Sequence, residues 1–259
     1  MRKTTVITLS LSFLLGLDVY SGGELSDNQK AIDVTHYDIN LKIDPNRKII
    51  SGKVGITFLL EEQPKNFEFD LIDSLKVSEV SINEMTLSFY QKTNKIIISN
   101  PGFEIGKTHS ALIKYGGEPP VAKNPPWVGG FSWEKSEDGR PWIGVSCQAN
   151  GAYIWYPCKE HPSDKSNGAK IAITVPEPLV VASNGLLTSV ESVGNKWKTW
   201  TWETQYSISP YNINFTVGNF KKVEKTIYLI DKPLSLVYYV LPESMYGAKT
   251  LLSEAEKYL

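Results

Sequence analysis

Residues 141–165 read Pro-Trp-Ile-Gly-Val-Ser-Cys-Gln-Ala-Asn-Gly-Ala-Tyr-Ile-Trp-Tyr-Pro-Cys-Lys-Glu-His-Pro-Ser-Asp-Lys, and they contain both cysteines of the chain. Two apolar segments rich in β-favouring residues flank the pair Asn150-Gly151, which tolerates positive φ. Pro157 and Pro162 then exclude a regular strand or helix across the charged residues between them. The stretch predicts a rigid loop presented by a sheet, which is where binding residues tend to lie.

The composition excludes some classes of partner. With 27 basic and 28 acidic residues the net charge is −1, so no bulk attraction to nucleic acid or to an anionic membrane is expected. The 259 residues suffice for one large all-β domain, or for one domain and part of another. Charged residues at 21% and aromatic residues at 11% are typical of a packed globular protein.

The N-terminus has the pattern of a secretory signal peptide. A positive start, Met1-Arg2-Lys3, precedes an apolar run from Val6 to Leu17 that Asp18 ends. The run is shorter than the ~20 residues of a membrane-spanning helix. We therefore expect residues 1–22 to be a signal peptide, with cleavage between Ser21 and Asp27 and export to the periplasm or the medium.

Apolar and polar residues alternate with a period of two over much of the first hundred residues, which predicts half-buried strands. The turn sequence Asp44-Pro45-Asn46-Arg47 separates the first two strands, and later strands are expected at 77–82, 86–90 and 96–98. We expect a mainly β, antiparallel, sandwich-like domain or an open curved sheet. The inward-facing residues are Tyr37, Ile39, Leu41, Ile43, Val54, Ile56, Phe58, Leu60, Phe67, Phe69 and Leu71.

Aromatic residues, mostly tryptophans, gather in two places, and each group can be explained as a stacking surface or as core packing. One group follows a proline-rich, exposed connection at 116–130, and it could stack on sugars or pack in the core: Trp127, Phe131, Trp133 and Trp142. Packing is the simpler explanation for these residues. It also suffices for Trp200 and Trp202, which strand alternation places on one face.

The C-terminal segment predicts a helix that starts at Pro242 and Glu243. No Gly, Asn or Pro closes it, and its apolar stripe consists of Met245, Ala248, Leu252, Ala255 and Leu259. We interpret 234–259, a short strand and this helix, as the start of a further domain. The alternative is a terminal helix that folds back on the sheet.

Several segments, taken in order, resemble the N-terminal domain of the aminopeptidase N family of zinc metallopeptidases, the gluzincins, which also includes leukotriene hydrolase. Residues 157–165 resemble its Pro-Cys-x-Asp/Glu-x-Pro-x-x-Lys signature. Segments 181–185, 208–211 and 215–220 resemble its Ser-Asn segment, its Ser-x-Tyr segment and its Phe-x-Val-Gly-x-Phe strand. The chain departs from the family at Tyr153, where many members have arginine, and at His161, where many have a second acid.

The resemblance implies a saddle-shaped β domain, here residues 31–230, that covers the catalytic domain of a zinc aminopeptidase acting on peptide N-termini. Residues 234–259 are then expected to be the start of that catalytic domain. The family's zinc motif His-Glu-x-x-His and its substrate motif Gly-x-Met-Glu-Asn do not occur in this sequence. We therefore expect this chain to bind no zinc, to supply no catalytic residue and to be inactive alone. The alternative is a stand-alone β-rich binding module without enzymatic activity.

The resemblance also assigns candidate site residues. The family position that matches Gln148 helps to bind the free α-amino group of the substrate, so Gln148 is the expected substrate-binding residue. The alternative is a glutamine that only ties two loops together. The residues expected to build the structural loop are Pro157, Cys158, Glu160, Pro162 and Lys165. Glu160 lies between two prolines, where backbone N–H groups or a cation could hold its carboxylate. A zinc site from Cys158 and His161 alone would be incomplete.

The two cysteines allow a disulfide or two free thiols. An exported protein could join Cys147 to Cys158. If Asn150-Gly151 formed a two-residue hairpin turn, however, Cys147 would face Ile154 and Cys158 would face Ile143, which puts the sulfurs out of register. Buried free thiols are therefore the preferred interpretation.

Overall fold

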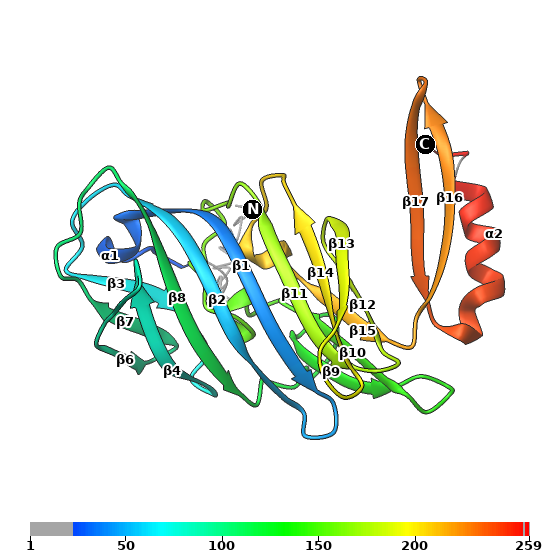
Figure 1. The fold of residues 1–259 in the computed structure, drawn as a ribbon, viewed down its shortest axis with the longest axis horizontal. Helices are drawn as coiled ribbons and strands as arrows, with labels where there is room; N and C mark the ends of the chain where they lie inside the picture. The colour runs from blue at the N-terminus through cyan, green and yellow to red at the C-terminus, as the bar shows by residue number, and fades with distance from the viewer. Residues whose placement is uncertain (1–22, 256, 259) are drawn as a thin grey trace, which may run out of the picture.

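The structure, a computed structural model, describes residues 23–255 and 257–258, so the predicted signal peptide lies outside the described residues. Strands dominate these residues, and the largest sheet crosses the whole domain (Figure 1). Its eight strands have the order β13-β14-β11-β1-β2-β8-β4-β5. In that order they are Leu186–Ser192, Trp197–Thr204, Ala169–Pro176, Ile32–Asp44, Ile49–Leu60, Thr108–Gly117, Leu75–Ile82 and Met85–Thr86.

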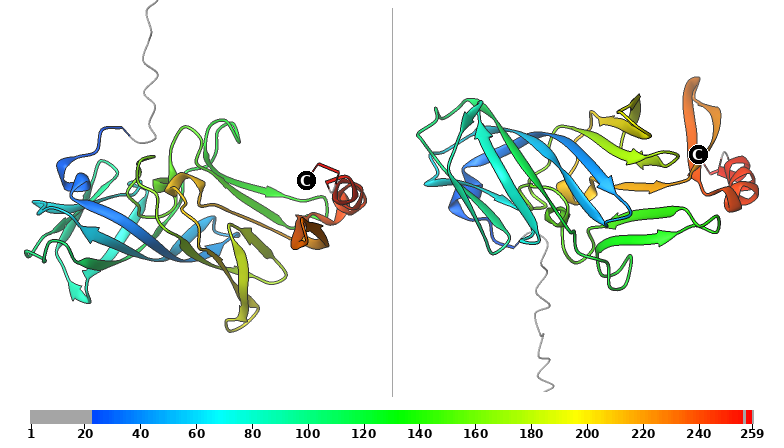
Figure 2. Two further views of the ribbon diagram at one scale, coloured as in Figure 1. Left: turned by 90° about the horizontal axis from the view of Figure 1, so that it is seen from above. Right: turned by 60° about the horizontal axis from the view of Figure 1, so that its bottom comes forward.

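Two smaller sheets lie against different halves of the large sheet (Figures 1 and 2). The first has the order β3-β7-β6, with β6 next to β4, and consists of Asn66–Asp70, Lys95–Ser99 and Phe89–Lys92. The second has the order β12-β15-β10-β9, with β12 next to β11 and β14, and consists of Val180–Ser183, Phe215–Gly218, Pro141–Ser146 and Gly130–Lys135. This architecture confirms the mainly β prediction.

The core lies between these layers, and the period of two predicted it correctly. Each of the inward-facing residues expected on β1, β2 and β3 is buried. Burial of a large apolar side chain contributes ~1.5–3 kcal/mol, so this shared face accounts for much of the driving force for folding. Among the pairings of the named strands, that of β1 with β11 departs from the antiparallel prediction, because these two strands are parallel. The long chain between these two strands permits a crossover that short hairpin turns do not.

Packing explains most of the aromatic residues that the sequence left open. Phe131 is fully buried and stacks on Trp133, with ring centroids 5.3 Å apart. Trp202 is buried, and Trp200 packs against the same core. Trp127 is the exception in the first group, since it is 71% exposed.

The C-terminal part forms a hairpin, β16 (Lys221–Leu229) and β17 (Lys232–Val240), followed by α2 (Met245–Ala255). A 3-10 turn, η3 (Pro242–Ser244), starts the helix where the sequence predicted it. The helix packs against both hairpin strands and buries Ala248 and Leu252; Leu259 lies outside the described residues. The expected boundary between 31–230 and 234–259 therefore falls inside a paired hairpin, and the division into domains stays a prediction.

Candidate functional site

The loop at 157–165, here called the signature loop, is fixed to the end of β3. Asp70 N donates to Cys158 O at 2.7 Å, and Cys158 N donates to Asp70 O at 3.1 Å. This single antiparallel bridge is the strand-like pairing that the loop makes there. Within the rest of the loop, His161 N donates to Lys159 O at 3.0 Å and Asp164 N donates to His161 O at 3.1 Å. Side chains attach the loop to the surrounding strands.

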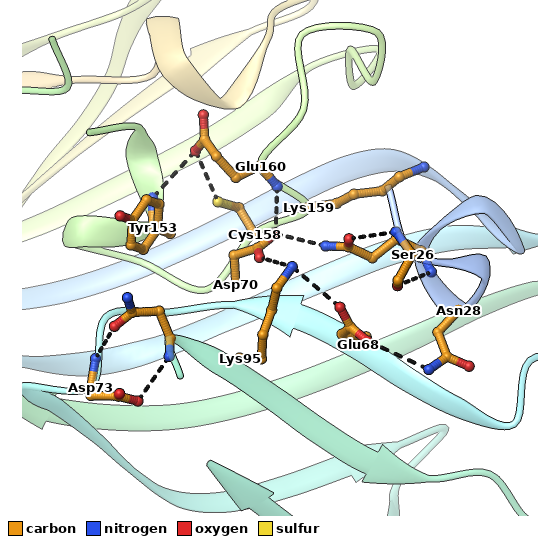
Figure 3. A network of polar contacts seen from close by, with 12 residues as sticks. Ser26, Asn28, Glu68, Asp70, Asp73, Lys95, Tyr153, Cys158, Lys159 and Glu160 are labelled. Carbon is orange, nitrogen blue, oxygen red and sulfur yellow. Dashed lines mark hydrogen bonds and ion pairs between the residues drawn. The ribbon is translucent and has the colours of Figure 1, made fainter. Parts of the chain in front are cut away.

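Glu160 is the central side chain of the loop and is only 9% exposed. Its Oε2 accepts from Ala152 N at 2.6 Å. Figure 3 shows two further contacts of this carboxylate: Tyr153 N donates to Oε2 at 3.3 Å, and the Cys158 thiol donates to it at 3.5 Å. Burial raises the pKa of the Glu160 carboxyl, although these hydrogen bonds oppose the shift. The backbone N–H groups of Ala152 and Tyr153 thus hold the carboxylate in place.

Gly151 makes room for this carboxylate. Its φ is +115°, and a Cβ added there would lie 2.6 Å from Glu160 Cδ. The two-residue hairpin turn considered at Asn150-Gly151 was wrong, because the chain turns into a 3-10 helix, η1 (Ala152–Ile154). The physical reason is that two hydrogen-bonding arrangements compete for the same donors. The N–H groups of Ala152 and Tyr153 donate to Glu160, whereas in a hairpin a second strand would use such groups to pair with the first strand.

A second buried acid, Asp70, joins β3 to the signature loop. Its Oδ2 accepts from Gln29 Nε2 at 2.8 Å and from Glu160 N at 2.9 Å. Lys95 on β7 pairs with Asp70 and also with Glu68 (Figure 3). Burial raises the pKa of Asp70, and the Lys95 charge opposes the shift. Gln29 belongs to the short helix α1 (Asp27–Lys30), so this cluster joins the helix and both strands to the loop.

Lys159 and Asp164 form a buried ion pair within the loop. Each is 5% exposed, and Lys159 Nζ lies 2.7 Å from Asp164 Oδ2. Lys159 Nζ also donates to Ile32 O at 2.6 Å, and Lys159 N donates to the Tyr37 hydroxyl at 3.2 Å. Burial raises the pKa of Asp164 against the effect of Lys159. These contacts attach the loop to β1, so its buried charges have partners within the fold.

Gln148, by contrast, is exposed two residues after β10 ends. Tyr211 donates its hydroxyl hydrogen to Gln148 Oε1 at 2.6 Å. Beside Tyr211, a cavity of about 280 Å³ opens between the signature loop and the 3-10 helix η2 (Pro210–Asn212). Lys165 is exposed and lines this cavity together with His161. The arrangement offers an amide oxygen and a hydroxyl at an open surface, next to a rigid loop.

Both cysteines are buried free thiols, as the sequence analysis preferred. Burial raises the pKa of Cys147 to about 12 and that of Cys158 well above its usual value. Thiolates are the reactive form of cysteine, so neither side chain is suited to nucleophilic chemistry here.

Comparison with known proteins agrees with this geometry. The profile of the peptidase M1 N-terminal domain matches residues 33–212. The chain belongs to this family. Leucine aminopeptidase 2 of Vanderwaltozyma polyspora is 25% identical to it over 200 residues, which cover 74% of this chain and 29% of that protein. Human glutamyl aminopeptidase is 35% identical over 94 residues, 36% of this chain and 9% of that protein.

Solved structures show the same M1 N-terminal fold. A variant of a two-domain M1 zinc metallopeptidase, bound to L-tryptophan, superposes with a TM-score of 0.70 at 24% identity, covering 85% of this chain and 50% of that one. The M1 zinc metallopeptidase of Deinococcus radiodurans gives 0.67 at 24% identity, covering 80% and 47%. This M1 chain therefore spans about a third or less of the named relatives and about half of the solved chains.

The zinc implied by the M1 family does not fit the described residues. No group of three or more His, Cys, Asp or Glu within 23–255 and 257–258 could hold a metal ion. His109 contacts Asn83 and the Glu104 carbonyl, and His161 contacts Ser163.

The same part of the chain contains no helix long and apolar enough to cross a membrane.

Sequence reasoning missed several residues that build this region. Gln29, Asp70 and Lys95 hold the signature loop from segments 60 or more residues away in the sequence, and no local pattern marks them. Tyr211 was noted only as part of a family segment. Its partner Gln148 lies 63 residues away, and only the fold brings the two together.

Proposed function

We propose that this chain is the substrate-covering N-terminal domain of an exported zinc aminopeptidase whose zinc domain lies outside these 259 residues. The observation that carries the proposal is the exposed amide of Gln148, hydrogen-bonded to Tyr211 at the cavity beside the signature loop, in a chain of the M1 family. The buried loop side chains build the scaffold, whereas Gln148 is available to a ligand. The proteins named as relatives are aminopeptidases.

The chemistry of Gln148 suits recognition of a peptide N-terminus. An aminopeptidase must bind the α-ammonium group of its substrate, which offers N–H donors and a positive charge. Gln148 Oε1 is an acceptor with two lone pairs, of which Tyr211 uses one. A hydrogen bond to a charged group contributes ~1.5–3 kcal/mol, so the second lone pair can contribute substantially to substrate affinity.

The test is Gln148→Ala in the full-length, zinc-loaded protein. We expect kcat/KM for aminoacyl anilides to fall by ~1–3 kcal/mol, about 5- to 150-fold, with an unchanged melting temperature. Gln148→Glu should retain activity, and Gln205→Ala, at another exposed glutamine, should have no effect. Parent activity in Gln148→Ala would remove Gln148 from the substrate site. The 259-residue chain alone should show no turnover.

Export is the remaining part of the proposal. It is supported by the positive start and the apolar run at 6–17 of the sequence. The N-terminal residue of the protein recovered from the native host tests it. A mature chain that starts between Ser21 and Asp27 is expected, and an intact Met1 would refute export by this signal.

A further inference from the structure

The hydrogen bond between Tyr211 and Gln148 joins two exposed side chains. Tyr211 is 36% exposed, and Gln148 is exposed as well. A neutral hydrogen bond contributes only ~0.5–1.5 kcal/mol to stability, and water competes with it at an exposed position. Stability alone therefore gives little reason for a short, 2.6 Å contact at this place.

The backbone on both sides of Tyr211 is fixed. The Pro210 carbonyl accepts from the Tyr156 hydroxyl at 3.2 Å and from Ile213 N at 3.1 Å. The Asn212 carbonyl accepts from Asn184 Nδ2 at 3.1 Å. Tyr156 is fully buried, so η2 is attached to the core, and the Tyr211 hydroxyl projects from a rigid base.

The backbone of Gln148 is fixed independently. Gly129 N donates to Gln148 O at 2.8 Å, and Gln148 N donates to Ser146 Oγ at 3.4 Å. A Cβ at Gly129 would lie 2.6 Å from Gln148 O, so the two loops touch closely. The remaining freedom of Gln148 is the rotation of its own side chain, and Tyr211 restricts that rotation.

We propose that Tyr211 is a positioning residue that sets the orientation of the Gln148 amide for the substrate ammonium; this rests on the proposed function. An amide turned by 180° about its terminal torsion presents NH₂ instead of oxygen, and that group repels an ammonium. By donating to Oε1, Tyr211 favours the orientation that keeps the oxygen at the site. The second lone pair of Oε1 then accepts from the substrate.

The experiment is a double-mutant cycle in the full-length, zinc-loaded protein, with an aminoacyl anilide as the probe. Tyr211→Phe removes only the hydroxyl. It should raise KM by roughly 3- to 10-fold, the cost of ordering one flexible side chain, with kcat within about 2-fold of the parent. In a Gln148→Glu background the same change should cost less than about 2-fold, because both carboxylate oxygens are acceptors and either orientation binds an ammonium.

Two controls separate positioning from other roles. Tyr206→Phe removes a hydroxyl from a tyrosine that is 84% exposed, and it should change neither KM nor the melting temperature. Tyr211→Phe should also leave the melting temperature unchanged, which excludes a loss of folding as the cause of a higher KM.

The outcomes distinguish the two levels of the proposal. An equal loss from Tyr211→Phe in both backgrounds would overturn positioning, because the tyrosine would then act on the substrate directly or through packing. Parent kinetics for Tyr211→Phe, together with impaired Gln148→Ala, would overturn positioning and leave the proposed function intact. Parent kinetics for Gln148→Ala would refute the role of Gln148 itself.

Discussion

Replacement of Glu160 by alanine tests whether its held carboxylate stabilises the fold. The change removes the acceptor of the N–H groups of Ala152 and Tyr153 and of the Cys158 thiol. Ala152 and Cys158 are fully buried, so water cannot readily replace the lost carboxylate. We therefore expect a clear loss of stability, although the exposed loop end at Gln148 is not directly touched.

The expected size follows from these contacts. A buried donor left without a partner costs ~1–3 kcal/mol, and two backbone donors are affected. The raised pKa of Glu160 shows that burying the charged carboxylate is itself unfavourable, which offsets part of the loss. We expect Glu160→Ala to lower the free energy of unfolding by about 3 kcal/mol, or the melting temperature by roughly 6–12 °C for a domain of this size.

Thermal and urea unfolding of the 259-residue chain, followed by circular dichroism, measure this loss. Glu62→Ala is the matched control, because Glu62 is exposed and such changes alter stability by less than ~0.5 kcal/mol. Glu160→Gln, which retains an acceptor oxygen, should fall between the two. A melting temperature within about 2 °C of the parent for Glu160→Ala would refute the structural role of this carboxylate.

Two further predictions concern the same region. Gly151→Ala should lower the free energy of unfolding, measured with urea, by more than ~2 kcal/mol, because the added Cβ would lie 2.6 Å from Glu160 Cδ. The control Gly194→Ala has a similar positive φ, +62°, but open space around the added Cβ, so it should cost only ~1 kcal/mol. Equal losses for the two variants would contradict the close approach at Gly151. Because the folded-state pKa of Glu160 is raised, the carboxyl contributes stability that is fully present below its unfolded pKa of ~4.3 and lost as the pH rises through the folded value. Between pH 4.5 and 7, the free energy of unfolding of the parent should therefore fall relative to that of Glu160→Gln. Urea midpoints whose difference stays constant over this range would contradict the prediction.

Much of the candidate site was visible in the sequence, but its internal geometry was not. Pro157 and Pro162 restrict the backbone locally, so the signature loop could be predicted from its own residues. The sequence singled out Glu160 as a carboxylate that backbone N–H groups or a cation could hold. The backbone donors are Ala152 and Tyr153, and their choice depends on the 3-10 helix that the chain forms after Gly151.

The sequence by itself determined β1 and β2 and their buried faces, because side-chain direction alternates strictly along a strand and the apolar residues of both strands record it. The strand expected at 86–90 was wrong, since Met85–Thr86 and Phe89–Lys92 are separate strands of different sheets. The sequence also determined the start of the C-terminal helix, where Pro242 is suited to a first turn. Only the tertiary structure decided that β1 pairs β11 in parallel, that Lys95 and Gln29 converge on Asp70, and that Tyr211 meets Gln148. These contacts join residues far apart in the chain, and their partners are chosen by the packing of whole sheets, which no local pattern encodes.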